Sequence, residues 1–196
     1  SDATGCTFTG NVNVDNKANC VYLYAATLTD CSLTRNSGLG TVGVSTYWGT
    51  YWNTLRNCLV ADNVNTTYAA VCGPNWATMF RLENCTVARN ASGSAGAGGV
   101  HGGVHPDHKV SVTLLNSVVW GNTTNGHNLV ADGSCGETSG NPLLLDLREY
   151  YGGDINTQAL AEGSPAVDAG DPDDCPATDQ RGVSRPQVTG CDLGAY

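Results

Sequence analysis

The chain has 196 residues and a formal net charge of -9, and only 14% of its residues are charged. Gly, Thr and Asn, which are poor helix formers, make up about a third of it, so the composition argues against a helical protein. The acidic balance argues against a nucleic-acid or anionic-membrane partner, because both need clusters of Lys and Arg. No apolar run is long enough to span a membrane as a helix, and nine cysteines indicate an oxidising compartment. We therefore expect an exported β-protein.

A short pattern that ends in asparagine occurs five times in the first two thirds of the chain. The copies are residues 5–11, 30–36, 57–63, 84–90 and 116–122. Their second residues are four cysteines and then a serine, separated by 25, 27, 27 and 32 residues. A period in the twenties is typical of a solenoid built from stacked coils.

Alternation within each copy predicts short strands. In the second copy, Cys31 and Leu33 should point to one face, and Ser32 and Thr34 to the other. The polar residue before the cysteine or serine is expected to be a bend between two strands of one coil. In the last four copies this residue is Asp30, Asn57, Asn84 or Asn116.

Stacked coils would place equivalent residues about 4.8 Å apart, which predicts ladders of identical or similar side chains. The expected apolar ladders are Leu28, Leu55, Leu82 and Leu114; Cys6, Cys31, Cys58, Cys85 and Ser117; and Phe8, Leu33, Val60, Val87 and Val119. An asparagine ladder is expected at a turn, formed by Asn11, Asn36, Asn63, Asn90 and Asn122. Beside it, Arg35, Asp62 and Arg89 should form a solvated ladder of alternating charge.

These copies, above all residues 84–90 and 116–122, resemble the right-handed parallel β-helix repeat proteins of bacterial surfaces and secretions. The resemblance implies an all-β fold, a right-handed parallel β-helix with an irregular C-terminal cap. We expect about five coils in residues 1–140 and a capping module in residues 141–196. Because the chain starts at the first bend of a coil, we also expect it to be a fragment or processed form of a longer protein.

The C-terminal residues, from Asn141 to Tyr196, look like the terminal module of bacterial "choice-of-anchor" β-helix proteins. The matching segments are residues 163–171, 175–186 and 191–196. The resemblance implies an extracellular or cell-surface location and a disulfide between Cys175 and Cys191. It implies no reaction, since fold alone does not settle function.

The ladder cysteines allow two interpretations. Neighbouring coils have a suitable Cα separation for disulfides, but parallel side-chain vectors suit a bridge poorly, so buried thiols are favoured. Cys20, Cys72 and Cys135 lie off the ladder, and a pair among them stays open. No Cys-x-x-Cys occurs, which argues against zinc-ribbon, thioredoxin and haem-attachment motifs.

Two segments carry weak signals for a metal ion, although no cofactor is required. The first holds three imidazoles and a carboxylate that could bind zinc if the loop folds back, namely His101, His105, Asp107 and His108. A polar loop without metal is the favoured interpretation. The second is an acid-rich turn that could supply oxygens to calcium, with Asp168, Asp171, Asp173 and Asp174. Here structural pairing is favoured, with Asp168 bound to Arg181 or Arg185.

Evidence for catalysis is weak in the sequence. Several β-helix proteins are polysaccharide lyases or glycosidases, which need a base beside calcium ligands or two carboxylates facing one sugar bond. Asp30, Asp62 and Glu83 occupy different registers, and no Gly-x-Ser-x-Gly elbow occurs. We therefore favour a non-catalytic protein and keep a carbohydrate-active enzyme, or its C-terminal remnant, as the alternative.

Aromatic residues give the best functional signal. Seven of them fall in the equivalent stretch of three successive coils: Tyr22, Tyr24, Tyr47, Trp48, Tyr51, Trp52 and Trp76. Some should pack inside, but adjacent residues such as Tyr51 and Trp52 cannot both point inward on a strand. An exposed aromatic strip suits sugar rings or a partner protein. We expect a surface or filament-associated module that binds glycan or another surface protein, with a purely structural, self-associating subunit as a further alternative.

Four Asn-x-Ser/Thr triplets, at Asn65, Asn84, Asn90 and Asn122, could accept glycans in a eukaryotic host. Two of these asparagines belong to the predicted ladder and Asn84 to a bend. We therefore expect all four to have structural roles.

Overall fold

The computed structural model describes residues 2–15, 20–39, 44–46, 51–65, 70–72, 79–93, 98–101, 111–123, 129–130, 141–147 and 156–196. This part of the chain is all-β, and its only helix is the short 3₁₀ turn η1 (Pro172–Asp174). The strands form four sheets, which we call A to D, and every pairing within them is parallel.

The chain visits the four sheets in a fixed order. Sheet A contains β1 (Ala3–Thr4), β5 (Thr27–Thr29), β9 (Trp52–Arg56), β13 (Met79–Glu83) and β17 (Ser111–Leu115). Sheet B contains β2 (Thr7–Thr9), β6 (Ser32–Thr34), β10 (Leu59–Ala61), β14 (Thr86–Ala88) and β18 (Val118–Trp120). Sheet C contains β3 (Val12–Asn13), β7 (Ser37–Gly38), β11 (Val64–Asn65) and β15 (Ala91–Ser92). Sheet D contains β4 (Val21–Leu23), β8 (Val44–Thr46), β12 (Val71–Cys72), β16 (Val100–His101) and β19 (Leu129–Val130).

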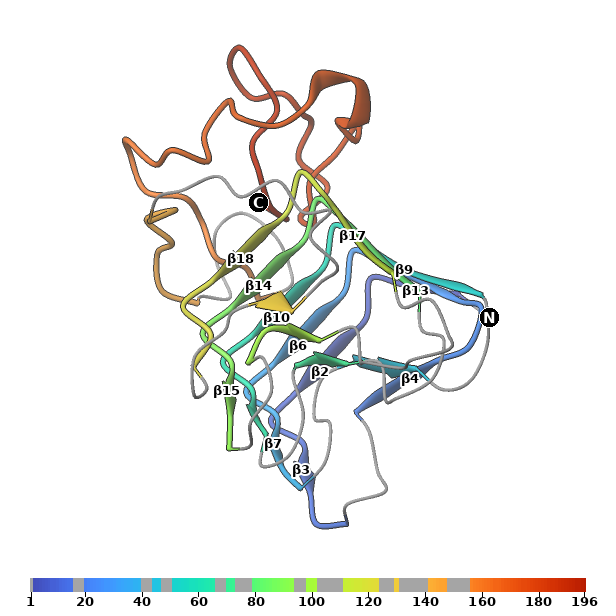
Figure 1. Ribbon diagram of the computed structural model, residues 1–196. Helices are drawn as coiled ribbons and strands as arrows, with labels where there is room; N and C mark the ends of the chain where they lie inside the picture. Colours follow the sequence, from blue (N-terminus) through green and yellow to red (C-terminus); the bar gives the residue numbers. More distant parts are fainter. Residues whose placement is uncertain are drawn as a thin grey trace.

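One circuit through sheets A, B, C and D is here called a coil. Each of the first four coils adds one strand to each sheet, and the fifth adds β17, β18 and β19 to sheets A, B and D, so the coils lie one upon another (Figure 1). The predicted registers are confirmed. Leu28, Leu55, Leu82 and Leu114 pair in sheet A, and Phe8, Leu33, Val60, Val87 and Val119 pair in sheet B.

Two corners in each coil are made by residues with positive φ. The first, between sheets A and B, falls on the predicted bends, with φ of 53° at Asp30, 50° at Asn57 and 52° at Asn84. Asn and Asp tolerate this left-handed conformation better than most residues. The second, between sheets B and C, falls on the residue before the ladder asparagine and includes Arg35 and Arg89, each with φ of 55°.

The asparagine ladder follows the second corner and is confirmed. Asn36 donates through its backbone N–H and its side-chain Nδ2 to Oδ1 of Asn63, at 3.0 and 2.9 Å. Asn63 makes the same two bonds to Asn90, at 3.0 and 2.8 Å. Because these amides are buried, the ladder satisfies polar groups that would otherwise be costly to bury.

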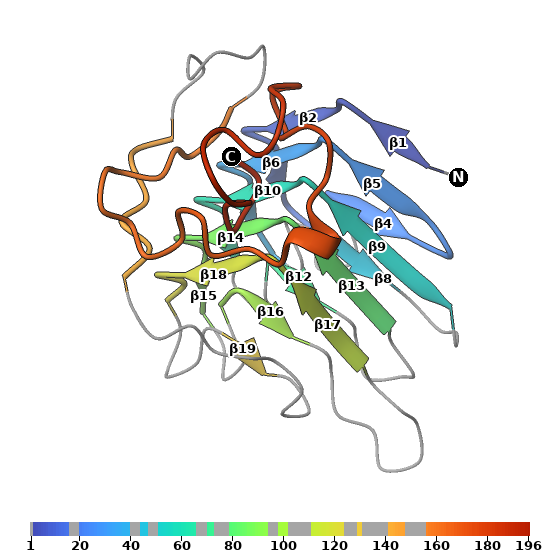
Figure 2. The ribbon, with the colours of Figure 1, turned by 90° about the horizontal axis from the view of Figure 1, so that it is seen from above.

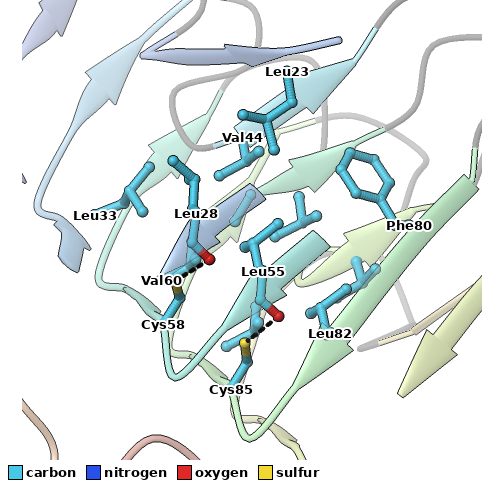
Figure 3. Packing of buried hydrophobic residues seen from close by; sticks show 14 of the residues in the cluster. Leu23, Leu28, Leu33, Val44, Leu55, Cys58, Val60, Phe80, Leu82 and Cys85 are labelled. Atoms are coloured by element: carbon cyan, nitrogen blue, oxygen red, sulfur yellow. Dashed lines mark hydrogen bonds between the residues drawn. The ribbon is translucent and has the colours of Figure 1, made fainter. Parts of the chain in front are cut away.

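The interior is filled by apolar residues from sheets A, B and D (Figure 3). The ladder cysteines belong to it as thiols: Cys58 Sγ lies 3.5 Å from the carbonyl oxygen of Leu28, and Cys85 Sγ lies 3.3 Å from that of Leu55. The favoured interpretation, buried thiols, is therefore confirmed for Cys31, Cys58 and Cys85.

The C-terminal residues lie across the outer face of sheet B (Figure 2). Gln180 Nε2 donates to the carbonyl oxygen of Cys31 at 2.9 Å, and the Ala195 N–H donates to Oγ1 of Thr86 at 3.1 Å. Outward side chains of sheet B, such as Ser32 and Thr34, are consequently buried. The expected boundary at residue 140 lies outside the described residues.

Candidate functional site

Four of the seven predicted aromatic residues lie in the described part of the chain, and all four are about half exposed. The exposed fractions are 49% for Tyr22, 55% for Tyr24, 51% for Tyr51 and 43% for Trp52. Tyr47, Trp48 and Trp76 lie outside the described residues. We call the four exposed residues the aromatic patch.

The connection between sheets D and A positions Tyr24 and Tyr51, while Tyr22 belongs to β4 and Trp52 to β9. Tyr24 follows β4 and Tyr51 precedes β9, so they occupy the same place in successive coils. Their ring centroids are 5.5 Å apart with an interplanar angle of 61°, an edge-to-face contact. For these two tyrosines, this confirms that they fall in the equivalent stretch of successive coils.

Trp52 is the first residue of β9, and its neighbours explain why it faces solvent. Asn53 and Leu55 are buried, whereas Trp52, Thr54 and Arg56 alternate with them on the outer face of sheet A. Tyr51 is also exposed. It lies before the first residue of β9, so the alternation of inward and outward side chains along the strand does not apply to it. The expectation that Tyr51 and Trp52 do not both point inward is therefore confirmed.

An ion-pair cluster lies on the same face of sheet A. Glu83 Oε2 accepts a hydrogen bond from Arg56 Nε at 2.6 Å, and Glu83 also forms an ion pair with Arg81, whose Nε lies 2.5 Å from Oε1. Register places Arg56 beside Glu83 and Thr54 beside Arg81. The two arginines were not among the predicted site residues, although the shared alternation of residues 52–56 and 79–83 indicates that both face outward.

The disulfide between Cys175 and Cys191, which the resemblance implied, is confirmed. Arg185 fixes the segment beyond it by donating to the carbonyl oxygens of Asp192, Gly194 and Tyr196. Burial lowers the pKa of Arg185 from its ordinary value. These contacts hold the C-terminal residues in place.

The acid-rich turn uses its carboxylates as local hydrogen-bond acceptors. Asp168 accepts from the Thr189 hydroxyl at 2.8 Å and from the Gly190 N–H at 2.7 Å, and these bonds lower its pKa. Asp171 caps η1 by accepting from the Asp173 N–H at 3.0 Å.

The prediction that Asp168 binds Arg181 or Arg185 is wrong. Arg181 binds Asp179 instead, and Arg185 binds carbonyl oxygens. Asp179 also accepts from the Val183 N–H, which places it inside its own turn. Within the described residues, no group of His, Cys, Asp and Glu side chains is arranged to hold a metal ion.

His101 is the only member of the histidine-rich segment within the described residues, because His105, Asp107 and His108 lie outside them. It belongs to β16 and is partly buried. Burial lowers its pKa, which favours the neutral imidazole at neutral pH. The zinc hypothesis therefore stays a prediction.

The three carboxylates considered for catalysis each have a structural partner. Asp62 accepts two hydrogen bonds from Arg89, at 2.9 and 3.2 Å, which confirms that part of the charge ladder. Asp30 Oδ1 accepts from Asn57 Nδ2 at 3.1 Å, and Glu83 binds two arginines. All three carboxylates therefore take part in contacts between successive coils or along one strand.

Three of the four asparagine triplets are not accessible for glycosylation, because Asn84, Asn90 and Asn122 are buried. This agrees with their expected structural roles. The side chain of Asn65 lies outside the described residues.

No protein-family model, no curated protein and no solved structure matches this chain. None of the helices in the described residues is long and apolar enough to cross a membrane. The aromatic patch and the ion-pair cluster beside it form the candidate binding surface.

Proposed function

We propose that this chain is a non-catalytic, extracellular module that binds glycan through the aromatic patch. The scaffold would be a right-handed parallel β-helix capped by a module of the choice-of-anchor type. The four parallel sheets, the stacked registers and the disulfide support that assignment. The disulfide also supports export, since such bonds persist in oxidising compartments.

The observation that carries the proposal is the exposed pair Tyr24 and Tyr51 beside Trp52. Exposed aromatic rings on a folded surface commonly mark a binding site, because they present apolar area that a partner can cover. Aromatic faces pack well against the apolar C–H faces of sugar rings. Successive coils present these faces along the stack, which suits the repeating units of a polysaccharide.

The test is a glycan array probed with the intact protein and with the variants Trp52→Ala and Tyr51→Ala. We expect each variant to bind about tenfold more weakly, which is the loss expected when a central aromatic anchor is removed. Trp120→Ala is the matched control, because Trp120 is an exposed tryptophan on sheet B, outside the patch.

Unchanged array signals for Trp52→Ala and Tyr51→Ala would contradict the proposed site. Release of reducing ends or unsaturated uronates from a polysaccharide panel would contradict the non-catalytic assignment. In that case the alternative of a carbohydrate-active enzyme would replace it.

A further inference from the structure

We propose that the ligand of this face is an acidic polysaccharide, whose carboxylates bind Arg56 and Arg81 while its sugar rings pack on the aromatic patch. This inference rests on the proposed function and specifies the substrate class. It follows from the position of the two guanidinium groups on sheet A, next to Trp52.

The three side chains lie on one face at distances suited to a sugar chain. Trp52 and Arg56 are four residues apart on β9, and Arg81 is in register with Thr54, between them. With about 3.3 Å per residue and about 4.8 Å between strands, the Cα of Trp52 lies about 8 Å from that of Arg81. A sugar ring packed on the indole could therefore reach this guanidinium with its carboxylate.

Both guanidinium groups are accessible, with 48% of the Arg56 side chain and 45% of the Arg81 side chain exposed. Each uses Nε to bind Glu83, which is largely covered and holds the two groups in place. In the described part of the chain the Nη atoms of both arginines have no other partner. These atoms are the donors that bind a carboxylate most specifically.

The local charge supports an anionic ligand. Two arginines share one glutamate, so this cluster has a net charge of +1 on a chain whose net charge is -9. A single positive excess beside aromatic rings suits spaced carboxylates on neutral sugar rings. It does not suit the dense phosphates of nucleic acid, which need many more Lys and Arg.

The test measures binding of the intact protein to polygalacturonate, to the same polymer after reduction of its carboxyl groups, and to polyglutamate. We expect polygalacturonate to bind, and the reduced polymer and polyglutamate to bind about tenfold more weakly or not at all. Added salt should weaken the binding of polygalacturonate and leave that of neutral polymers unchanged.

Variants locate the interaction. We expect the double variant Arg56→Gln/Arg81→Gln to lose about tenfold in affinity for polygalacturonate, and Arg56→Lys/Arg81→Lys to lose less because the charge is kept. Arg35→Gln is the matched control, since Arg35 is an exposed arginine at a corner between sheets B and C. Unchanged unfolding midpoints would show that the variants are folded.

Each outcome decides between the proposals. If neutral polymers bind as tightly as acidic ones, and Trp52→Ala weakens them while the arginine variants do not, glycan binding stands and the acidic ligand is wrong. If neither these polymers nor any glycan of the array binds, both proposals are wrong. If polyglutamate binds as tightly as polygalacturonate, the partner is an acidic peptide and this inference is overturned.

Discussion

Asparagine residues have different structural roles at the two corners of each coil. At the first corner, Asn57 and Asn84 adopt positive φ and their side chains donate to carbonyl oxygens of the C-terminal segment. At the second corner, the left-handed residue is Asp62, an arginine or a glycine, and the asparagine that follows it is buried in the ladder in every coil after the first. The left-handed conformation costs about 1–2 kcal/mol for most residues, and the ladder bonds offset that cost.

At this scale we predict that Asn63→Ala lowers the free energy of unfolding by about 3 kcal/mol. The substitution removes the acceptor for two buried donors of Asn36 and the donor to the carbonyl oxygen of Leu33. Urea unfolding followed by circular dichroism measures the loss.

Asn11→Ala is the control for that experiment. Asn11 lies at the end of the ladder and is exposed, so water can replace its side-chain donor to Asn36, and the backbone N–H of residue 11 still donates to Asn36 Oδ1. We expect a loss of about 1 kcal/mol or less. Equal losses in the two variants would contradict the argument that burial makes the ladder bonds important.

At the scale of elements, sheet B and the C-terminal segment depend on each other. Leu59 and Ala61 face outward from β10 and are buried together with Leu147. Without the segment, these side chains and the hydroxyls of sheet B would face water. Polar and apolar contacts together therefore attach the segment along several coils.

We predict that Gly194→Ala loosens this attachment. Gly194 has φ of +98°, and a Cβ there would lie 2.7 Å from Oγ1 of Thr86, the atom that accepts from the Ala195 N–H. Limited proteolysis of the native protein should then cut residues 156–196 faster than in the unmodified chain.

Gly163→Ala separates this contact from backbone strain. Gly163 also has positive φ, at +78°, but a Cβ there meets no atom within 4 Å. Both variants carry the conformational cost of about 1–2 kcal/mol, and only Gly194→Ala adds the clash. If both variants are cut at the same rate, close packing against Thr86 does not hold the segment.

At the scale of the whole molecule, the repeat made the registers predictable, because equal spacing places Leu55 beside Leu28 and Leu82 beside Leu55. The contact between Tyr24 and Tyr51 follows from the same spacing. The burial of Thr86 beneath Ala195 was not predictable in detail, since that contact joins residues 109 positions apart with no shared pattern. The Arg56–Glu83–Arg81 cluster was missed because charged positions vary from coil to coil while the apolar ladders repeat.

The buried cysteine thiols predict how the protein reacts with an alkylating reagent before and after unfolding. Burial raises the pKa of Cys58 well above its ordinary value, so almost no thiolate forms near neutral pH. We expect Cys31, Cys58 and Cys85 to resist alkylation in the native protein and to react together when it unfolds. Mass spectrometry after iodoacetamide treatment, at increasing urea concentrations, measures this.

Cys6 is the internal comparison, because its side chain is partly exposed at the first coil. It should be alkylated without urea. Alkylation of Cys58 at low urea, before the loss of the circular dichroism signal, would show that single coils open separately and would contradict cooperative unfolding of the stack.

The contacts of the C-terminal segment along the first corner restrict how such a chain can gain or lose coils during evolution. The segment makes one hydrogen bond to each of four successive coils. The bonded pairs are Asp171 with Asn116, Asp174 with Asn84, Thr178 with Asn57, and Gln180 with Cys31. A duplicated coil inserted among these four would move the coils on one side of it by about 4.8 Å relative to the C-terminal segment. The hydrogen bonds between the segment and those coils would then be broken. A duplication ahead of Cys31 would leave all four contacts intact. Length variation among natural variants of this chain should therefore concentrate on the N-terminal side of that residue.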